Sequence, residues 1–381
     1  MLNIVVPMAG RGSRFVEAGY LSPKPLIQVG GKPMVQWVVE NVRPSTRHRF
    51  IFICLAEHLR MYPEVAITLK SLCDGCEIIE ATEVTQGAAC TVLLARQLID
   101  NCDPLMIVNA DQIVEMPIDS YLAAMEESDA DGLIMTFWSD HPKWSYCKMR
   151  PDGTVAQLVE KQVVSNDATV GIYNFRRGKD YVRAADSMIA KNLRVNNEFY
   201  VAPTYNELIS GGARIVVCPT GREYDGMFGL GIPNDLEFFL TSEVYRRGRS
   251  TRMSSDYESV ELTRKRTEIY ARFFNDKNLA GLRAIMDENI ALTDPNGSIR
   301  GRDEVMSFSS GLFSSSSSFA FRPLRVIAEL EISVIEFELI LGSEKLVGAD
   351  IVRWTSDNRI ASIDAYLYEA NGGRHVGADL G

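Results

Sequence analysis

The sequence predicts an α/β protein with a doubly wound, mostly parallel sheet, followed by a smaller α+β domain. Three observations support this fold class. Short β-branched runs alternate with helical patterns over residues 1–245, as in consecutive βαβ units. Residues 246–255 are polar, charged and without periodicity, as expected of a linker. Residues 256–381 then place helical patterns before long strands, which is typical of a separate α+β domain.

Five strands are predicted in the N-terminal domain, most of them without a polar interruption, as expected for strands buried on both faces. They are Leu2–Met8, Phe50–Leu55, Glu77–Glu80, Pro104–Asn109 and Gly132–Trp138. Helical spacing lies between them at Pro33–Arg43, Glu57–Leu72, Gly87–Ile99 and Pro117–Glu127. The alternation changes after Trp138, so we expect Ala168–Phe175 to extend the sheet as an antiparallel strand.

The C-terminal domain is predicted to begin with two helices, Val260–Phe274 and Leu279–Met286, and a short strand, Ile290–Thr293. Longer strands then follow one another, with turn residues between them. These strands are Ala320–Leu330, Ile332–Leu341, Leu346–Thr355 and Ile360–Tyr368. Their order predicts an antiparallel meander.

Composition excludes several classes of protein. With 46% hydrophobic and 24% charged residues, the chain is an ordinary globular protein. A net charge of −10 argues against a nucleic acid polymer as partner. No apolar run is long enough to cross a bilayer, and no secretory signal pattern is present. Seven cysteines, an odd number, fit reduced thiols better than disulfides. We therefore expect a cytoplasmic protein without a membrane partner.

A glycine-rich loop follows the first strand, and its small residues let backbone N–H groups approach a phosphate closely. Arg14 offers a fork of donors suited to phosphate oxygens, and Lys24 follows between two prolines that stiffen its backbone. The loop matches neither the dinucleotide fingerprint nor the Walker loop. Alone, it fits a tight strand-to-helix turn equally well. The loop residues are Met8, Ala9, Gly10, Arg11, Gly12, Ser13 and Arg14.

Together, PMAGRGSRF and SPKPLIQVGGKPMVQ resemble the signature of the sugar-phosphate nucleotidylyltransferase family. This resemblance covers residues 1–245 and implies a Rossmann-like nucleotidyltransferase fold. It also implies an enzyme that transfers a nucleoside monophosphate from a nucleoside triphosphate to a small phosphorylated acceptor, with release of pyrophosphate. In such enzymes the loop wraps the triphosphate, and Arg14 and Lys24 would neutralise its charge.

Two further segments resemble the family's nucleotide and metal sites. Gln86, Gly87 and Ala88 resemble the small-residue segment that lies along the base. Asn109 and Asp111 resemble the strand end at which an aspartate binds Mg²⁺. Ligands of open α/β sheets bind at such strand ends, and Mg²⁺ prefers oxygen ligands. The resemblance thus implies Mg²⁺ as the cofactor, with Asp111 as its ligand.

The acceptor side resembles the family as well. Glu160 and Lys161 resemble a pair in which the lysine meets the acceptor's phosphate and the glutamate its polar groups. Gly171 lies in the following strand, where a glycine allows the acceptor to approach closely. Trp138, Trp144 and Tyr146 are candidates for stacking on a substrate, with Tyr146 placed at the acceptor, although aromatic residues near strand ends also pack in cores.

One motif departs from the family. Many relatives carry a second metal-binding aspartate, whereas Met227–Pro233 has a glycine in that place. Asp225 or Glu198 is therefore the candidate for the missing carboxylate, unless the metal has fewer protein ligands.

The segment containing Asn197, Glu198 and Tyr200 resembles a capsule-associated subgroup that includes a cytidylyltransferase. This favours CTP as the nucleotide, and an activated precursor of a cell-surface conjugate as the product. We expect these three residues to contact the acceptor. The alternatives are a sugar-1-phosphate uridylyl- or thymidylyltransferase, and a non-catalytic nucleotide-binding module.

The C-terminal domain resembles the polyketide-cyclase-like (nuclear-transport-factor-2-like) cone fold. Asp294, Asp350 and Asp364 are its candidate polar groups for a cone pocket. Domains of this kind dimerise, bind ligands or catalyse. The strand Ile332–Leu341 carries apolar residues on both faces, so we expect a homodimer that buries the second face.

Overall fold

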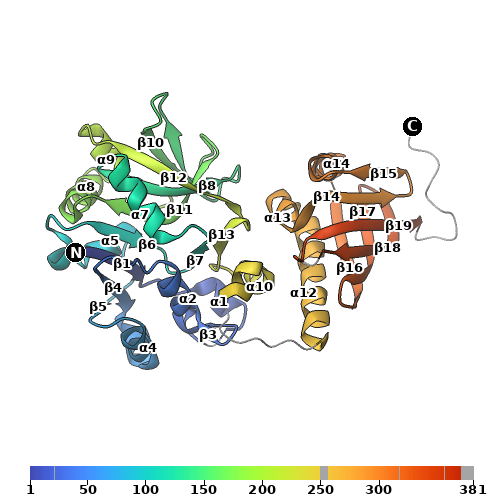
Figure 1. Cartoon of the computed structure of the whole chain (residues 1–381), viewed down its shortest axis with the longest axis horizontal. Helices are drawn as coiled ribbons and strands as arrows, with labels where there is room; N and C mark the ends of the chain where they lie inside the picture. Colours follow the sequence, from blue (N-terminus) through green and yellow to red (C-terminus); the bar gives the residue numbers. More distant parts are fainter. Residues whose placement is uncertain (21, 249–255, 317, 356, 370–381) are drawn as a thin grey trace. The chain divides into compact units, whose positions relative to one another are not determined.

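The computed structural model of the chain describes residues 1–20, 22–248, 256–316, 318–355 and 357–369 (Figure 1). It divides into two compact units, Met1–Leu236 and a second unit from Glu237 onward. The first unit contains a large parallel-rich sheet of eleven strands, and the second contains a separate sheet of six. The predicted fold class is confirmed.

Four parallel strands form one half of the larger sheet. In spatial order they are β5 (Glu77–Ala81), β4 (His48–Leu55), β1 (Leu2–Met8) and β6 (Leu105–Val108). Nearly every β1 residue is buried, because neighbouring strands flank it on both sides and apolar side chains cover both of its faces. The chain leaves β1 toward β4 and β5 and later returns to β6 on the other side. A topological switch point, where open α/β sheets bind ligands, therefore lies between β1 and β6.

The other half of this sheet is mixed. Strand β11 (Asp167–Phe175) lies antiparallel between β6 and β8 (Gly132–Trp138), as predicted. The sheet continues through β12 (Ile215–Glu223), β13 (Gly226–Gly229) and β7 (Gln112–Val114). A hairpin of β9 (Ser145–Met149) and β10 (Val155–Glu160) lies off this path and joins it where β9 pairs with β11. Strands β2 (Gln28–Val29) and β3 (Lys32–Pro33) form a small separate ladder.

Two predicted helices, α2 (Met34–Asn41) and α7 (Ile118–Glu127), are confirmed. Two other predictions are wrong as single helices. The predicted helix Glu57–Leu72 is broken by Pro63, which cannot donate a backbone hydrogen bond. The predicted helix Gly87–Ile99 is broken by a tight turn at Leu94 and Ala95. The resulting pieces are α3 (Ala56–Met61) and α4 (Glu64–Leu72), then α5 (Ala88–Leu93) and α6 (Arg96–Ile99). The unit also contains α1 (Ser13–Glu17), η1 (Lys24–Leu26), α8 (Gly178–Ala190) and α9 (Thr204–Ser210).

The second unit forms the predicted meander with additions. The sheet order is β15-β14-β19-β18-β17-β16, and β14 runs parallel to β19. Helix α14 and strand β15 are elements that the sequence does not predict. The bounds are α12 (Asp256–Asn275), α13 (Leu279–Ile285), β14 (Met286–Asp294), β15 (Gly297–Arg300), α14 (Arg302–Ser314), β16 (Phe319–Ala328), β17 (Ile332–Leu341), β18 (Glu344–Trp354) and β19 (Ile360–Glu369).

The unit boundary at Leu236 falls within α10 (Pro233–Thr241), ahead of the predicted domain end at residue 245. Hydrogen bonds within the second unit explain this position. Arg266 donates to the Thr241 carbonyl at 2.7 Å, and Asn358 donates to Glu243 at 2.8 Å. Of the predicted linker, residues 246–248 end α11 (Glu243–Gly248), and residues 249–255 lie outside the described residues.

Two of the three carboxylates predicted for a cone pocket lie elsewhere. Asp294 is partly exposed and accepts backbone N–H groups in the β14–β15 turn, and Asp364 forms an ion pair with the half-exposed Arg353. Asp350 alone of the three is buried, at 4% exposure, and accepts a hydrogen bond from the Tyr270 hydroxyl at 3.2 Å. Complete burial raises the pKa of Asp350 to about 7.

None of the helices in the described ranges has the length and apolar character needed to cross a membrane.

Candidate functional site

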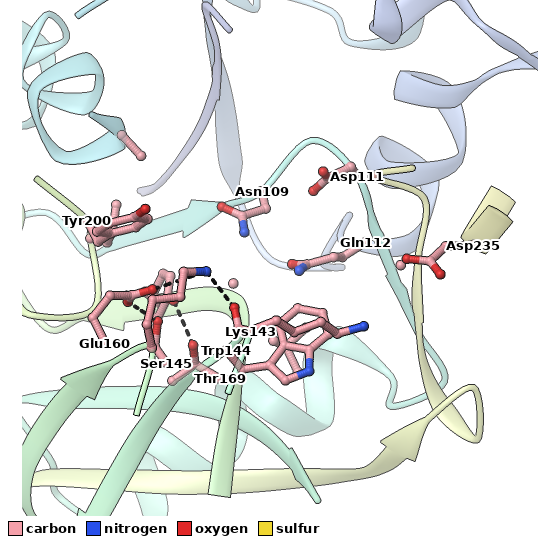
Figure 2. A pocket seen from close by; sticks show the side chains of 18 of the residues that line it. Asn109, Asp111, Gln112, Lys143, Trp144, Ser145, Glu160, Thr169, Tyr200 and Asp235 are labelled. Carbon is pink, nitrogen blue, oxygen red and sulfur yellow. Dashed lines mark hydrogen bonds and ion pairs between the residues drawn. The ribbon is translucent and has the colours of Figure 1, made fainter. Parts of the chain in front are cut away.

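A pocket of about 330 Å³ opens where β1 and β6 end in the first unit (Figure 2). It contains eight of the residues predicted for the site, and these come from segments far apart in the sequence. They are Arg14, Ala88, Asn109, Asp111, Glu160, Lys161, Gly171 and Tyr200. The fold therefore brings the predicted nucleotide, metal and acceptor segments into one cavity.

Lys24 reaches this pocket through an ion pair. Its Nζ atom lies 2.5 Å from Oδ2 of Asp111. Asp111 follows β6, and its backbone carbonyl accepts a hydrogen bond from the Leu230 N–H at 2.7 Å. A Cβ built on Gly12 would lie 3.2 Å from Cβ of Lys24. The glycine-rich loop and the lysine are thus packed side by side.

The glycine-rich loop is shorter than predicted. Helix α1 begins at Ser13, directly after Gly12, whose φ of 64° is left-handed and favours glycine. Ser13 and Arg14 therefore lie in a helical turn rather than in a loop, and the Arg14 side chain lines the pocket. Met8 and Ala9 are buried at the end of β1, whereas Gly10 and Arg11 are exposed.

The predicted base-binding segment is held by the chain around Phe199. The Phe199 N–H donates to the Gln86 carbonyl at 2.9 Å, and the Ala89 N–H donates to the Phe199 carbonyl at 3.0 Å. Gly87 has a φ of 128°, and a Cβ there would lie 2.5 Å from the Phe199 backbone. Only glycine permits this close contact. The contact places Ala88 in the pocket wall beside Tyr200.

Gly171 lies between the segments that were predicted to bind the nucleotide and the acceptor. Its carbonyl accepts a hydrogen bond from the Asn109 N–H at 2.9 Å. Its φ is 103°, and a Cβ would lie 2.2 Å from Nδ2 of Asn109 and 2.3 Å from Oε1 of Gln112. The missing side chain therefore makes room for the two amides.

The side of the pocket that was predicted to bind the acceptor contains a buried carboxylate and a lysine with a left-handed backbone. Glu160 has 2% side-chain exposure, accepts a hydrogen bond from Ser145, and lies 3.5 Å from Nζ of Lys161. Burial raises the pKa of Glu160 despite these partners. Lys161 has a left-handed φ of 58°, which is uncommon for a side chain of this size. Its Nζ donates to the Lys143 carbonyl at 2.5 Å and lies 5.7 Å from the ring centroid of Tyr200.

Tyr200 closes this side of the pocket opposite Asp111 and Asp235 (Figure 2). Desolvation, together with Glu198 and Glu160, raises the pKa of its hydroxyl to about 12. The hydroxyl therefore remains a hydrogen-bond donor at neutral pH.

The prediction for Tyr146 is wrong. Its ring is fully buried, and its hydroxyl donates to the His141 carbonyl at 2.7 Å. Successive residues of a strand point to opposite faces, so Ser145 faces the pocket and Tyr146 faces the core. The pocket aromatic from this segment is Trp144.

Three other predicted residues lie outside the pocket wall. Asn197 has a φ of 64° and forms a tight turn between Val195 and Glu198, whose backbones exchange two hydrogen bonds. Glu198 is exposed on this turn. Asp225 is exposed in the turn between β12 and β13. Neither carboxylate therefore supplies a second acidic group to the wall of the pocket.

Sequence reasoning missed several residues of the pocket. Gln112 follows Asp111 directly. Lys143 forms a 2.5 Å ion pair with Glu223, a carboxylate whose pKa burial raises. Asp235, in the first turn of α10, receives a hydrogen bond from the Tyr224 hydroxyl at 2.8 Å. Within the described ranges, no three His, Cys, Asp or Glu side chains cluster as metal ligands would.

Comparisons with known proteins identify the family of each unit. Residues 4–197 match the family described as nucleotidyl transferase, and residues 267–363 match the SnoaL-like domain. The chain is 29% identical over 181 residues to the catalytic subunit beta of mannose-1-phosphate guanylyltransferase from Danio rerio. That match covers 46% of this chain and 49% of the relative. The chain is also 23% identical over 185 residues to the bifunctional protein GlmU of Methanococcus maripaludis, and this match covers 46% of the chain and 40% of that protein. The chain thus spans about half the length, or less, of the curated relatives it matches.

Solved structures give the same result. A nucleoside-diphosphate-sugar pyrophosphorylase from Vibrio cholerae RC9 is 28% identical, with a TM-score of 0.54 over 62% of this chain and 99% of that one. A UDP-glucose pyrophosphorylase complexed with UDP-glucose shares the fold, at 15% identity and a TM-score of 0.52 over 65% of this chain and 100% of that one. The fold of the first unit is that of the nucleotidyltransferases. The chain belongs to the nucleotidyl transferase family, with a SnoaL-like domain at residues 267–363.

Proposed function

We propose that this protein transfers a nucleoside monophosphate from a nucleoside triphosphate to the phosphate of a small acceptor, and releases pyrophosphate. One observation carries the proposal: the Lys24–Asp111 pair and the Lys161–Glu160 pair lie at the same pocket. The first pair follows the glycine-rich loop, where a triphosphate would bind. The second lies on the opposite side, where the acceptor would bind. The names of two relatives, a mannose-1-phosphate guanylyltransferase subunit and a nucleoside-diphosphate-sugar pyrophosphorylase, support this reaction.

The proposed step needs alignment and charge neutralisation rather than a general base. A phosphate monoester is largely dianionic at pH 7. One of its oxygens attacks the α-phosphorus, a new P–O bond forms, and the bond to pyrophosphate breaks with its electron pair leaving on pyrophosphate. Lys161 would hold the attacking phosphate. Arg14 and Lys24 would balance the charge that develops on the leaving group.

The family implies a divalent cation, and the residues of this pocket fit one. The oxygens of Asp111 and Gln112 are of the type that Mg²⁺ prefers. Oε1 of Gln112 is also buried without a hydrogen-bond partner in the described part of the chain. When bound, the cation would neutralise phosphate charge and bring the two phosphates together. Asp111 would hold it.

For the nucleotide we propose CTP, and for the acceptor a small phosphorylated molecule used to build a surface conjugate in the cytoplasm. The likeness of the segment around Asn197 to the cytidylyl subgroup supports this choice. UTP or dTTP with a sugar 1-phosphate is the alternative. Calorimetric titration with CTP, UTP, dTTP, ATP and GTP in turn tests the proposal, and a clear preference for a purine triphosphate would overturn it.

Pyrophosphate release tests the transfer reaction itself. The full chain is mixed with Mg²⁺, each triphosphate and a panel of sugar, amino-acid and choline-type phosphates. Release that requires one triphosphate and one acceptor supports the proposal. Tight triphosphate binding without release across the panel would favour a non-catalytic nucleotide-binding module instead.

We further propose that the second unit pairs with the same unit of another chain. The inner face of its sheet is already buried within the unit, where Ile335 is 0% and Phe337 is 2% exposed. The outer face of the same sheet exposes large apolar and aromatic side chains. Ile327, Ile332, Tyr366 and Tyr368 are between 39% and 46% exposed. Burying such a face stabilises a dimer by about 25 cal/mol per Å² of apolar area before the loss of association entropy.

A further inference from the structure

The segment at the end of β13 carries two glycines, and a carboxylate lies against each of them. A Cβ built on Gly231 would lie 2.8 Å from Oδ2 of Asp111. A Cβ built on Gly229 would lie 3.2 Å from Oδ2 of Asp235. Both carboxylates line the same pocket, and Figure 2 shows them along one wall. The absence of side chains at the glycines lets both carboxylates approach this wall.

A third oxygen lies in the same wall. Gln112 is 8% exposed, and its buried Oε1 has no hydrogen-bond partner within the described ranges. In Figure 2 its side chain lies below Asp111, and its amide end is directed toward Asn109. A buried acceptor without a donor is uncommon in native proteins, and a bound ion is one of the arrangements that would satisfy it.

Asp235 is held in a defined orientation. It lies in the first turn of α10, and the Tyr224 hydroxyl donates to its Oδ1 atom at 2.8 Å. The other oxygen, Oδ2, is the one nearest Gly229. The hydrogen bond therefore fixes which carboxylate oxygen is presented along the wall that contains Asp111.

The charges in this wall need explanation, because the proposed substrates are polyanions. Two carboxylates in one pocket repel each other and repel a triphosphate. Lys24 contacts Asp111 and reduces this repulsion at one carboxylate. A divalent cation between the carboxylates and the phosphates would convert the repulsion on both sides into attraction.

We propose that Asp235 is the second carboxylate ligand of the divalent cation, together with Asp111. This inference rests on the proposed function. It assigns to Asp235 the role for which the sequence offered Asp225 and Glu198, two exposed residues outside the pocket wall. Gln112 presents its amide oxygen to the same cation. A carboxylate in the first turn of a helix also stabilises the helix dipole, so the test must separate binding from stability.

Electron paramagnetic resonance of Mn²⁺ makes this separation. Mn²⁺ is titrated into the full chain alone, and again with CTP, UTP, dTTP and GTP in turn. Asp235→Asn keeps an oxygen that can accept from Tyr224 but loses the charge. We expect it to weaken Mn²⁺ binding about 10- to 100-fold, on the scale of changes to metal-site groups. Asp225→Asn and Glu198→Gln are matched controls and should change binding less than about twofold, with thermal unfolding recorded for every variant.

A relocated carboxylate provides a second test. In the Asp235→Asn background, Gly229→Asp places a carboxylate on the residue that Oδ2 of Asp235 approaches. Recovery of Mn²⁺ binding in the double variant supports a shared position in the wall. Unchanged Mn²⁺ binding in Asp235→Asn, with loss in Asp225→Asn or Glu198→Gln, overturns the assignment of Asp235 and leaves the proposed transfer reaction intact. No Mn²⁺ binding by the unmodified chain under any condition overturns both.

Discussion

Nζ of Lys24 lies 2.5 Å from Oδ2 of Asp111, and both side chains are about a quarter exposed at the pocket. The pair joins the segment after the glycine-rich loop to the end of β6. A ligand can therefore reach both groups. Phosphate oxygens would draw Lys24 toward them and leave Asp111 to a cation.

Asp111→Asn is expected to lower kcat/KM for pyrophosphate release by about 10²- to 10³-fold, the scale seen when one charge-stabilising group is removed. The unfolding temperature should change little, because the side chain is partly exposed. Steady-state kinetics with calorimetry provide the two measurements. Lys32→Ala is the control, since it removes a lysine paired with Glu40 outside the pocket wall, and it should retain activity. Normal turnover and metal dependence in Asp111→Asn would contradict the site assignment.

Gly171→Ala should reduce activity through geometry alone. The new Cβ would displace the amides of Asn109 and Gln112, which it would approach within 2.3 Å. Gly153→Ala is a matched control, because Gly153 also has a positive φ, of 81°, but has open space around it. In both variants the positive φ should lower the free energy of unfolding by roughly 1 kcal/mol. Only Gly171→Ala should lose nucleotide affinity by calorimetry, and equal losses in both variants would refute the explanation.

The stability of the second unit should depend on pH through Asp350. Burial raises the pKa of this carboxyl from 3.8 to about 7, so the folded unit holds the proton more tightly than the unfolded chain. The stabilisation is complete below the unfolded pKa and is lost as the pH rises through the folded pKa. Asp350→Asn stays neutral and can still accept from Tyr270. We expect it to raise the unfolding temperature of this unit at pH 8 and to change it little at pH 4.

Scanning calorimetry of the full chain between pH 4 and 8 measures this dependence. Asp364→Asn is the control, because its partner Arg353 is exposed on the outer face and surface pairs contribute little. An Asp350→Asn variant with the same pH profile as the unmodified chain would show that Asp350 is ionised at no cost in the folded state.

Negative charge introduced on the outer face of the second sheet should separate the proposed dimer into single chains. The double variant Ile332→Glu and Tyr366→Glu changes two side chains that are 44% and 46% exposed, so it should not disturb the core. Light scattering of the full chain is expected to give half the mass of the unmodified protein. Phe308→Glu on α14, at 41% exposure, is the control and should leave the mass unchanged. A monomeric unmodified chain would refute pairing.

The predictable parts of the fold were those with a local signal. Runs such as Leu2–Met8 have the composition of buried strands, and Gly132–Trp138 has the bounds of β8. The break at Pro63 also had a signal, since proline disrupts helices, but the apolar spacing across it is continuous. The position of Asp235 in the pocket had no local signal in the sequence, because it depends on the end of β13 lying against the segment that follows β6. The prediction for Tyr146 was wrong because a shift of one residue along a strand moves a side chain to the opposite face of the sheet.

The arrangement of the β9–β10 hairpin has a consequence for how such proteins diversify. Trp144, Ser145, Glu160 and Lys161 lie on or beside this hairpin, which branches from the sheet at β11 instead of forming part of its main path. Substitutions there would reshape the surroundings of the proposed acceptor while the strands that carry the glycine-rich loop and Asp111 keep their register. A change of the proposed acceptor would therefore not require a change in the strands that hold the proposed phosphate-binding groups. Exchange of residues 139–166 between relatives is accordingly a direct route to hybrid enzymes with a new acceptor.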